Sequence, residues 1–343
     1  MDAFAESPEW GGSLVIFPFM YYETYGDDSL IKKYYPNMRR YVDYLKTRAD
    51  KGILSFGLGD WYDYGDFRAG FSRNTPVPLV ATAHYYMTVM YLVQAARMVG
   101  NDFDTRYYTS LAQDIMAAFN KCFLHKDTAQ YGTGSQCSNA LPLFLQMTQD
   151  ADEQGNYRPD ADLNEKVFAN LIKDVEAHGN RLTTGDVGNR YLIQTLARNG
   201  EHELIYKMFN HEEAPGYGFQ LKFGATTLTE QWDPRQGSSW NHFMMGQIDE
   251  WFFNSLVGIR PSTTTKQGYQ KFIIAPQPVG DLKYVKASYE TLYGTINVDW
   301  TCENGTFTLN VSVPVNTTAV VYLPGEKEPK EIQSGTYQLV CAK

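Results

Sequence analysis

Acidic residues lie next to tryptophans in three segments of this 343-residue sequence. Residues 6–12 read ESPEWGG, residues 57–64 read GLGDWYDY, and residues 224–242 read GATTLTEQWDPRQGSSWNH. Indole faces stack on the apolar faces of sugar rings, and a carboxylate accepts hydrogen bonds from two hydroxyl groups at once. The three segments therefore indicate a carbohydrate site.

Hydrolysis of a glycosidic bond is a reaction that such segments can support. One carboxylic acid protonates the leaving oxygen, and a second carboxylate activates water or attacks the sugar. For inversion the two groups lie about 6.5–9.5 Å apart, which leaves room for the water. Aromatic and apolar walls would raise the pKa of the acid and keep it protonated near neutral pH. The pair exists only if folding brings the segments together.

Each segment also has a purely structural interpretation. Ser7 and Glu9 can cap a helix that starts at Pro8. Gly59-Asp60 can form a turn, and residues 230–242 can be a capped helix start with aromatic packing.

Composition excludes several other classes of function. The net charge of -9 argues against nucleic acid and against an anionic membrane surface. No apolar run is long enough to span a bilayer, and the first residues do not resemble a signal peptide. The six histidines and four cysteines lack the spacing of a zinc site, although Cys302 and Cys341 could form a disulfide. No cofactor and no metal are expected.

Helical periodicity predicts the elements that position these segments. The predicted helices are 13–25, 28–45, 78–98, 105–123, 140–147, 162–177, 187–197, 201–209 and 238–257. Long loops rich in glycine and aromatic residues connect several of them. Such loops inside a compact domain usually carry function.

After residue 258 the pattern changes to short alternating segments. The predicted strands are 270–275, 285–293, 295–301, 306–313 and 318–323, separated by turn signals. We therefore predict two domains, a helical domain over residues 1–258 and a small antiparallel β-sandwich over residues 259–343.

Stacked helical hairpins fit a closed toroid or an open solenoid used for protein contacts. The absence of a fixed-length repeat favours the toroid. The sequence predicts about nine helices, fewer than a toroid of six hairpins needs, so we expect that the N-terminal helices are missing. The fold class is thus mainly α, with a partial (α/α)6 toroid followed by the sandwich.

The sequence resembles the bacterial α-L-rhamnosidases of glycoside hydrolase family 78 over nearly its whole length. The resemblance is carried by GATTLTEQWDPRQGSSWNHFMMGQIDEWFFNSLVGIRP, by LTTGDVGNRYLIQTLARNG, by FGLGDWYDYG and by PEWGGSLVIFPFMYYETYGD. The segments SYETLYGTINVDW and FTLNVSVPVNTTAVVYLP resemble the C-terminal β-sandwich of the family. The resemblance implies an (α/α)6 toroid, an inverting two-carboxylate mechanism on terminal α-L-rhamnosides, and no organic cofactor.

The resemblance also implies roles for individual residues. Glu230 matches the general base of the family. Glu6, four residues before Trp10, takes the place of the general acid, and Glu9 could serve instead. The expected sugar-binding residues are Trp10, Asp60, Trp61, Trp232, Trp240 and His242.

Two other functions stay open at this point. The aspartate that the family has shortly after the tryptophan is absent, and Gly12 and Ser13 occupy that region. The chain could therefore be a carbohydrate-binding relative that is impaired in catalysis, or another (α/α)6 glycosidase of the glucoamylase or trehalase type. The expected partner in each case is a carbohydrate.

Overall fold

The computed structural model describes residues 6–151, 157–262 and 268–342. The chain forms two compact units. The first contains Met1–Phe17, Lys32–Asn199 and Lys207–Gln247, and the second contains Pro18–Ile31, Gly200–Tyr206 and Ile248–Lys343. Within the described residues no helix is both long and apolar enough to cross a membrane.

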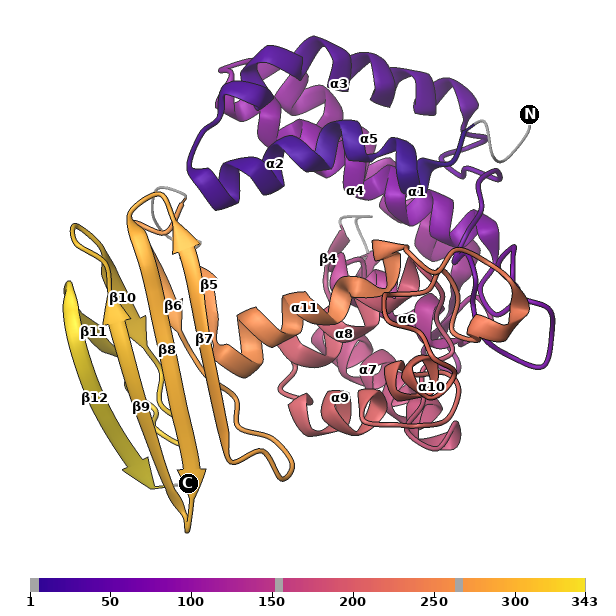
Figure 1. Ribbon diagram of the computed structural model, residues 1–343. Coiled ribbons are helices and arrows are strands. Elements are labelled where there is room, and N and C mark those ends of the chain that lie inside the picture. The colour runs from indigo at the N-terminus through magenta and orange to yellow at the C-terminus, as the bar shows by residue number, and fades with distance from the viewer. Residues whose placement is uncertain (1–5, 152–156, 263–267, 343) are drawn as a thin grey trace. The chain divides into compact units, whose positions relative to one another are not determined.

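Helices make up most of the first unit (Figure 1). The helices of the chain before residue 230 are α1 Pro8–Gly11, α2 Ser13–Tyr25, α3 Ser29–Arg48, α4 Val77–Met98, α5 Asp102–Phe123, α6 Gln136–Phe144, α7 Ala161–Ala177, α8 Gly188–Arg198, α9 His202–Phe209 and α10 Tyr217–Lys222. Two short hairpins accompany them, β1 Leu124–His125 with β2 Gln130–Tyr131, and β3 Gln149–Ala151 with β4 Tyr157–Pro159.

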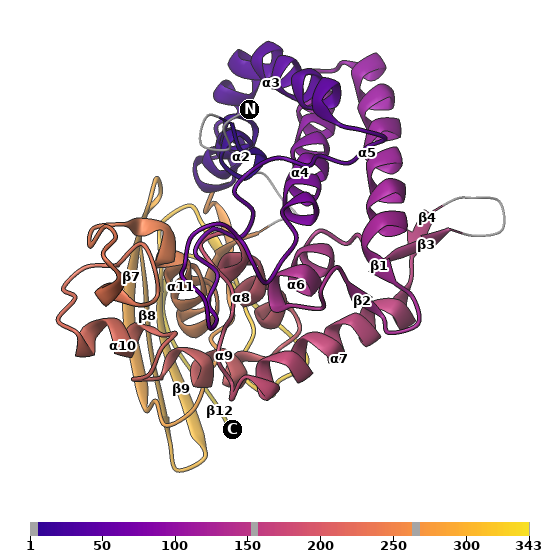
Figure 2. The ribbon, with the colours of Figure 1, turned by 90° about the vertical axis from the view of Figure 1, so that its right-hand side faces the viewer.

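Helices α4 and α5 form an antiparallel hairpin (Figure 2). Gly100 makes the turn with a φ of 73°, which favours glycine, and the Asn101 side chain then caps α5 by accepting the Asp104 N–H at 3.0 Å. Helix α4 is buried on most of its surface. Its sequence is apolar with little polar face, as expected for a helix surrounded by others.

Most predicted helices are confirmed to within a few residues. The helix predicted at 140–147 instead begins at Gln136, because Ser135 caps it through the Ser138 N–H. The segment after α9 also contains more helix than predicted, since α10 Tyr217–Lys222 lies inside an expected loop.

The single helix predicted over 238–257 is wrong. A 3-10 helix, η2 Phe243–Gln247, leads into α11 Ile248–Trp251 and a π-helical turn, η3 Phe252–Val257. The preceding residues pair with an earlier strand-like segment, because Glu230 N–H donates to Ser239 O at 2.9 Å and His242 N–H donates to Leu228 O at 3.0 Å. These backbone bonds use groups that a helix would have needed.

The second unit contains two four-stranded sheets (Figure 1). One has the strand order β12-β9-β8-β7 and the other β11-β10-β6-β5. The strands are β5 Ile259–Pro261, β6 Lys271–Ile274, β7 Tyr284–Thr291, β8 Gly294–Glu303, β9 Thr306–Val313, β10 Thr318–Val321, β11 Lys330–Ile332 and β12 Gly335–Ala342. Alternate residues of β8 and β9 are buried and form one core with residues of β6 and β10, as in a sandwich.

One sheet of the sandwich is mixed, whereas the sequence predicted an antiparallel arrangement. Strand β10 runs parallel to β6, with Thr318 opposite Lys271. The intervening strands β7, β8 and β9 belong to the other sheet. The chain therefore crosses over and returns in the same direction. The alternation of buried and exposed residues within each strand does not reveal which strands pair.

The cysteines of the sandwich are free thiols. Cys302 on β8 and Cys341 on β12 both pair in register with Phe307 of β9, one on each side. They are therefore two strand spacings apart, about 9–10 Å, which exceeds the reach of a disulfide.

Candidate active site

The N-terminal acidic segment lies against the glycine-rich loop that follows α3. Ser7 accepts the Leu58 N–H at 3.0 Å and donates to the Glu9 carboxyl, while Glu9 Oε1 accepts the Gly59 N–H at 3.1 Å. Gly57 has a φ of 134°, and a Cβ there would lie 2.7 Å from Glu9 Oε2. Glycine at this position therefore lets the carboxyl approach the loop backbone.

The two acids of this segment have different surroundings. Burial raises the pKa of Glu9 to about 7, and the nearby Glu6 charge adds to the effect. Glu6 accepts a hydrogen bond from the Tyr41 hydroxyl at 3.1 Å. Glu9 thus has the property that a general acid needs, a proton retained close to neutral pH.

Asp60 connects the same loop to the start of α8. Its side chain is fully buried, and Oδ1 accepts the Gly188 N–H at 2.7 Å. Burial raises its pKa to about 7. The neighbouring Trp61 is half-buried and packs edge-on against Phe71, with 5.2 Å between ring centroids. Asp60 therefore holds two distant segments together, and Trp61 retains partial access to solvent.

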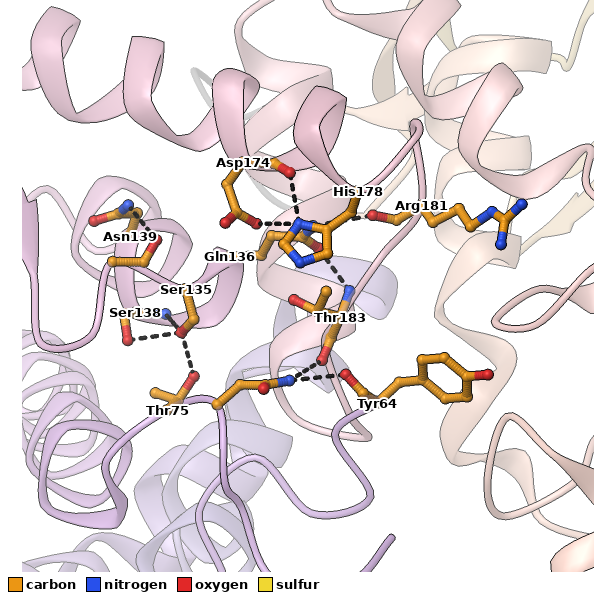
Figure 3. A network of polar contacts seen from close by, with 12 residues as sticks. Tyr64, Thr75, Ser135, Gln136, Ser138, Asn139, Asp174, His178, Arg181 and Thr183 are labelled. Atoms are coloured by element: carbon orange, nitrogen blue, oxygen red, sulfur yellow. Dashed lines mark hydrogen bonds and ion pairs between the residues drawn. The ribbon is translucent and has the colours of Figure 1, made fainter. Parts of the chain in front are cut away.

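A polar network fixes this loop to the segment before α8 (Figure 3). The Asn74 amide donates to Tyr64 O at 2.9 Å and to Thr183 O at 3.0 Å. Gln136, at the start of α6, accepts the Thr183 N–H at 2.8 Å and donates to Arg181 O at 3.0 Å. The network satisfies backbone groups that would otherwise be buried without partners, so both segments have defined positions.

The segment with Glu230 places its residues at different depths. Trp232 is 1% exposed and donates through Nε1 to Thr184 O at 2.9 Å, so neither face of its ring is open to solvent. Trp240 is 43% exposed. His242 is half-buried and its Nδ1 has no hydrogen-bond partner, while the half-buried Glu230 accepts the Ser239 N–H at 3.1 Å.

A pocket of about 350 Å³ lies within the first unit. This volume is within the range of small-molecule sites. Two residues predicted from the sequence line it, Glu9 and Trp10. The full lining is Glu9, Trp10, Ser13, His84, Asp186, Val187, Arg190, Tyr191, Phe243, Met244 and Gln247.

Asp186 is the principal residue of this pocket that the sequence interpretation missed. Its side chain is 2% exposed, and neither carboxyl oxygen has a hydrogen-bond partner. Burial raises its pKa to about 9, with further contributions from the charges of Asp60 and Glu230. The Glu230 carboxylate is therefore close enough to raise the pKa of Asp186, which lines the pocket. The available signal was an acid between two glycines, just before α8.

Two further lining residues, His84 and Tyr191, are bonded to each other. His84 bonds Val80 O at 2.8 Å and the Tyr191 hydroxyl at 2.9 Å. Burial lowers its pKa to about 4, so the imidazole is uncharged at neutral pH. In the part of the chain that the structure describes, no cluster of three or more His, Cys, Asp or Glu side chains could hold a metal ion.

Comparison with known proteins gives matches over both parts of the chain. Residues 1–256 match the family model of the bacterial alpha-L-rhamnosidase 6 hairpin glycosidase domain, and residues 258–338 match that of the bacterial alpha-L-rhamnosidase C-terminal domain. An alpha-L-rhamnosidase of Streptomyces avermitilis is 28% identical over 94% of this chain and 30% of its own length. One of Formosa agariphila is 29% identical over 96% of this chain and 35% of its own length.

Solved structures agree with these matches. The alpha-L-rhamnosidase from Dictyoglumus thermophilum superimposes with a TM-score of 0.86 at 29% identity, over 98% of this chain and 40% of that one. The Streptomyces avermitilis enzyme complexed with L-rhamnose gives a TM-score of 0.84 at 25% identity, over 97% of this chain and 33% of that one. The chain therefore spans about a third of the length of its curated relatives.

Proposed function

Since the chain belongs to the bacterial α-L-rhamnosidase family, with its six-hairpin glycosidase domain and C-terminal domain, we propose that it removes terminal α-L-rhamnose from glycosides or plant polysaccharides. The substrate is a carbohydrate, and the reaction proceeds with inversion by two carboxyl groups. The proposed reaction involves no nucleic acid, membrane or organic cofactor.

The observation that carries the proposal is the pocket that Glu9 lines. A carboxyl group with a pKa of about 7 meets the requirement for an acid that protonates the leaving oxygen at neutral pH. Trp10 lies beside it and offers an aromatic surface for a sugar. The effect of Glu230 on the pKa of Asp186 supports a second carboxylate near the same pocket.

In the proposed mechanism Glu230 is the general base. Its bond from the Ser239 N–H leaves carboxylate lone pairs free to accept a proton from water. The general acid comes from the segment of Glu6 and Glu9. Contact with the pocket and the raised pKa favour Glu9, whereas Glu6 occupies the position that the family resemblance implies.

The remaining predicted residues support this arrangement in two ways. Trp10, Trp61, Trp240 and His242 retain exposed surface and are proposed to contact the sugar or its aglycone. Asp60 and Trp232 are fully enclosed and are proposed to hold the binding loops in position.

Hydrolysis of an aryl α-L-rhamnoside by the purified protein tests the proposal. Inversion requires that β-L-rhamnose is the first product seen by proton NMR. Glu230→Gln is expected to lower kcat by roughly 10²–10⁴-fold while leaving the fold intact. Glu176→Gln, on the exposed face of α7, is the matched control and should behave like the unaltered protein.

The outcomes separate the alternatives that remain. Glu9→Gln and Glu6→Gln, compared on a substrate with a poor leaving group, identify the general acid. Loss of the general acid lowers the rate most on such a substrate, because a poor leaving group depends on protonation. Rhamnose binding by calorimetry without any hydrolysis would mean a binding protein impaired in catalysis. Hydrolysis at full rate by Glu230→Gln would disprove the mechanism.

A further inference from the structure

The backbone of Asp186 is held from two sides. Its N–H donates to Trp61 O at 2.7 Å, and its carbonyl accepts the Gln247 side-chain amide at 2.7 Å. Gln247 in turn accepts the Asn189 amide at 2.9 Å. The main chain of Asp186 therefore has a fixed position between the loop after α3 and the end of η2.

The side chain of Asp186 contrasts with this well-bonded backbone. It lines the pocket, it is 2% exposed, and both carboxyl oxygens lack a partner. A buried polar group without a hydrogen bond costs about 1–3 kcal/mol. Most buried polar groups in proteins are bonded, so an unbonded one at a pocket wall indicates a bond made to a ligand.

Neighbouring acids in the same region do not share this feature. Asp60 Oδ1 accepts the Gly188 N–H at 2.7 Å, and Asp63 Oδ2 accepts the Arg73 N–H at 2.7 Å. Both carboxyl groups hold loop backbone in place. Asp60 Oδ2 and Asp63 Oδ1 also lack a partner, but neither residue lines the pocket. Asp186 is thus the one of these three acids that can bond a molecule in the pocket, and both of its oxygens are unbonded.

A carboxylic acid in such a place has one O–H donor and one carbonyl acceptor on the same carbon. Two neighbouring hydroxyl groups of a sugar ring offer the complementary pair, one accepting and one donating. The raised pKa of Asp186, about 9, agrees with this use, because the group keeps its proton at neutral pH. A neutral group also avoids repulsion from Glu230.

We propose that Asp186 is a specificity-determining residue that binds two adjacent hydroxyl groups of the sugar as a neutral donor and acceptor. The inference rests on the proposed function and specifies one polar contact of that site. It assigns no proton transfer to Asp186. The contact acts on substrate binding, so its loss is expected mainly in KM.

Two replacements of Asp186 test the assignment. Asp186→Asn keeps one donor group and one acceptor in the same plane, so kcat/KM should stay within about threefold. Asp186→Ala removes both, and KM should rise about 10–100-fold, which corresponds to the loss of one or two bonds to a buried group. Asp114→Ala, on the exposed face of α5, is the control and should leave KM unchanged.

Rates on substrates that lack single hydroxyl groups distinguish a direct contact between Asp186 and the sugar from a purely structural role of Asp186. Among 2-, 3- and 4-deoxy aryl rhamnosides, the one or two that lose the Asp186 contact should be poor substrates for the unaltered protein. Asp186→Ala should no longer distinguish them from the complete substrate. If Asp186→Ala discriminates among the deoxy substrates as the unaltered protein does, Asp186 makes no contact with the sugar.

The remaining outcomes separate this inference from the proposed function. Loss of kcat in Asp186→Asn would overturn the neutral-binding role, because it would mean that the carboxyl transfers a proton. If the unaltered protein hydrolyses no rhamnoside but binds L-rhamnose, calorimetry on Asp186→Ala still tests the contact, with at least tenfold weaker binding expected. Neither hydrolysis nor rhamnose binding by the unaltered protein would overturn both proposals.

Discussion

Replacing Asp186 with asparagine is expected to stabilise the protein, and the gain should grow with pH. The pKa of Asp186 rises from 3.8 to about 9 in the folded protein, so the unfolded chain loses its proton first as the pH increases. Between these two values the folded state binds more protons, and the free energy of unfolding therefore falls with pH. Asparagine fills the same space, carries no charge and removes this dependence.

The size of the effect follows from the pKa difference. Each pH unit above 3.8 costs about 1.4 kcal/mol, which reaches on the order of 4 kcal/mol at pH 7. The difference in stability between Asp186→Asn and the unaltered protein should thus be small at pH 4 and largest near pH 9. The other buried acids, Asp60 and Glu9, are present in both proteins and cancel in the comparison.

Urea denaturation at pH 5, 6, 7 and 8 measures this difference. Asp114→Asn is the matched control, because its side chain is exposed on α5 and stays in water in both states. Its effect should not vary over this range. A stability difference for Asp186→Asn that is constant from pH 5 to 8 would refute the reasoning, since it would mean that Asp186 is ionised in the folded protein.

Three further predictions concern the acid, the loop glycine and the cysteines. If Glu9 is the general acid, kcat/KM should fall above pH 7 as Glu9 loses its proton, and a similar alkaline limb in Glu9→Gln would assign it to another group. Gly57→Ala should lower kcat/KM at least tenfold, because the new Cβ meets the Glu9 carboxyl. Gly70 also has a positive φ, 151°, but open space around it, so Gly70→Ala should change only stability, by about 1–3 kcal/mol. Equal activities of the two variants would contradict this expectation. Thiol titration in denaturant without reductant should show Cys302 and Cys341 free, and reductant should not alter stability.

Local patterns in the sequence determined most of the elements. Apolar residues at helical spacing predicted α3, α4, α5 and α7, because one turn of a helix places residues three and four apart on the same face. Strict alternation predicted β8 and β9, because successive side chains of a strand point to opposite faces of the sheet. The family resemblance, which is also a property of the sequence, gave the fold class and indicated the segments of the proposed site.

The irregular segment before α11 could not be predicted in this way. Residues 238–242 have a composition that suits a helix start, but their backbone groups bond to residues 228–230. Competition between local and distant hydrogen bonds decides such segments, and the sequence shows only the local partner.

The burial and hydrogen-bond partners of the acidic and aromatic residues were decided by the tertiary structure. The partner of Asp60 lies 128 residues away at Gly188, and that of Trp232 lies 48 residues away at Thr184. Asp186 differs from Asp60 only in what surrounds it: folding gives one carboxyl a backbone N–H and leaves the other at a pocket wall without one. Residue type and spacing determined which groups could do chemistry, whereas burial and hydrogen bonding, which depend on residues distant in sequence, decided which of them remain free to do it.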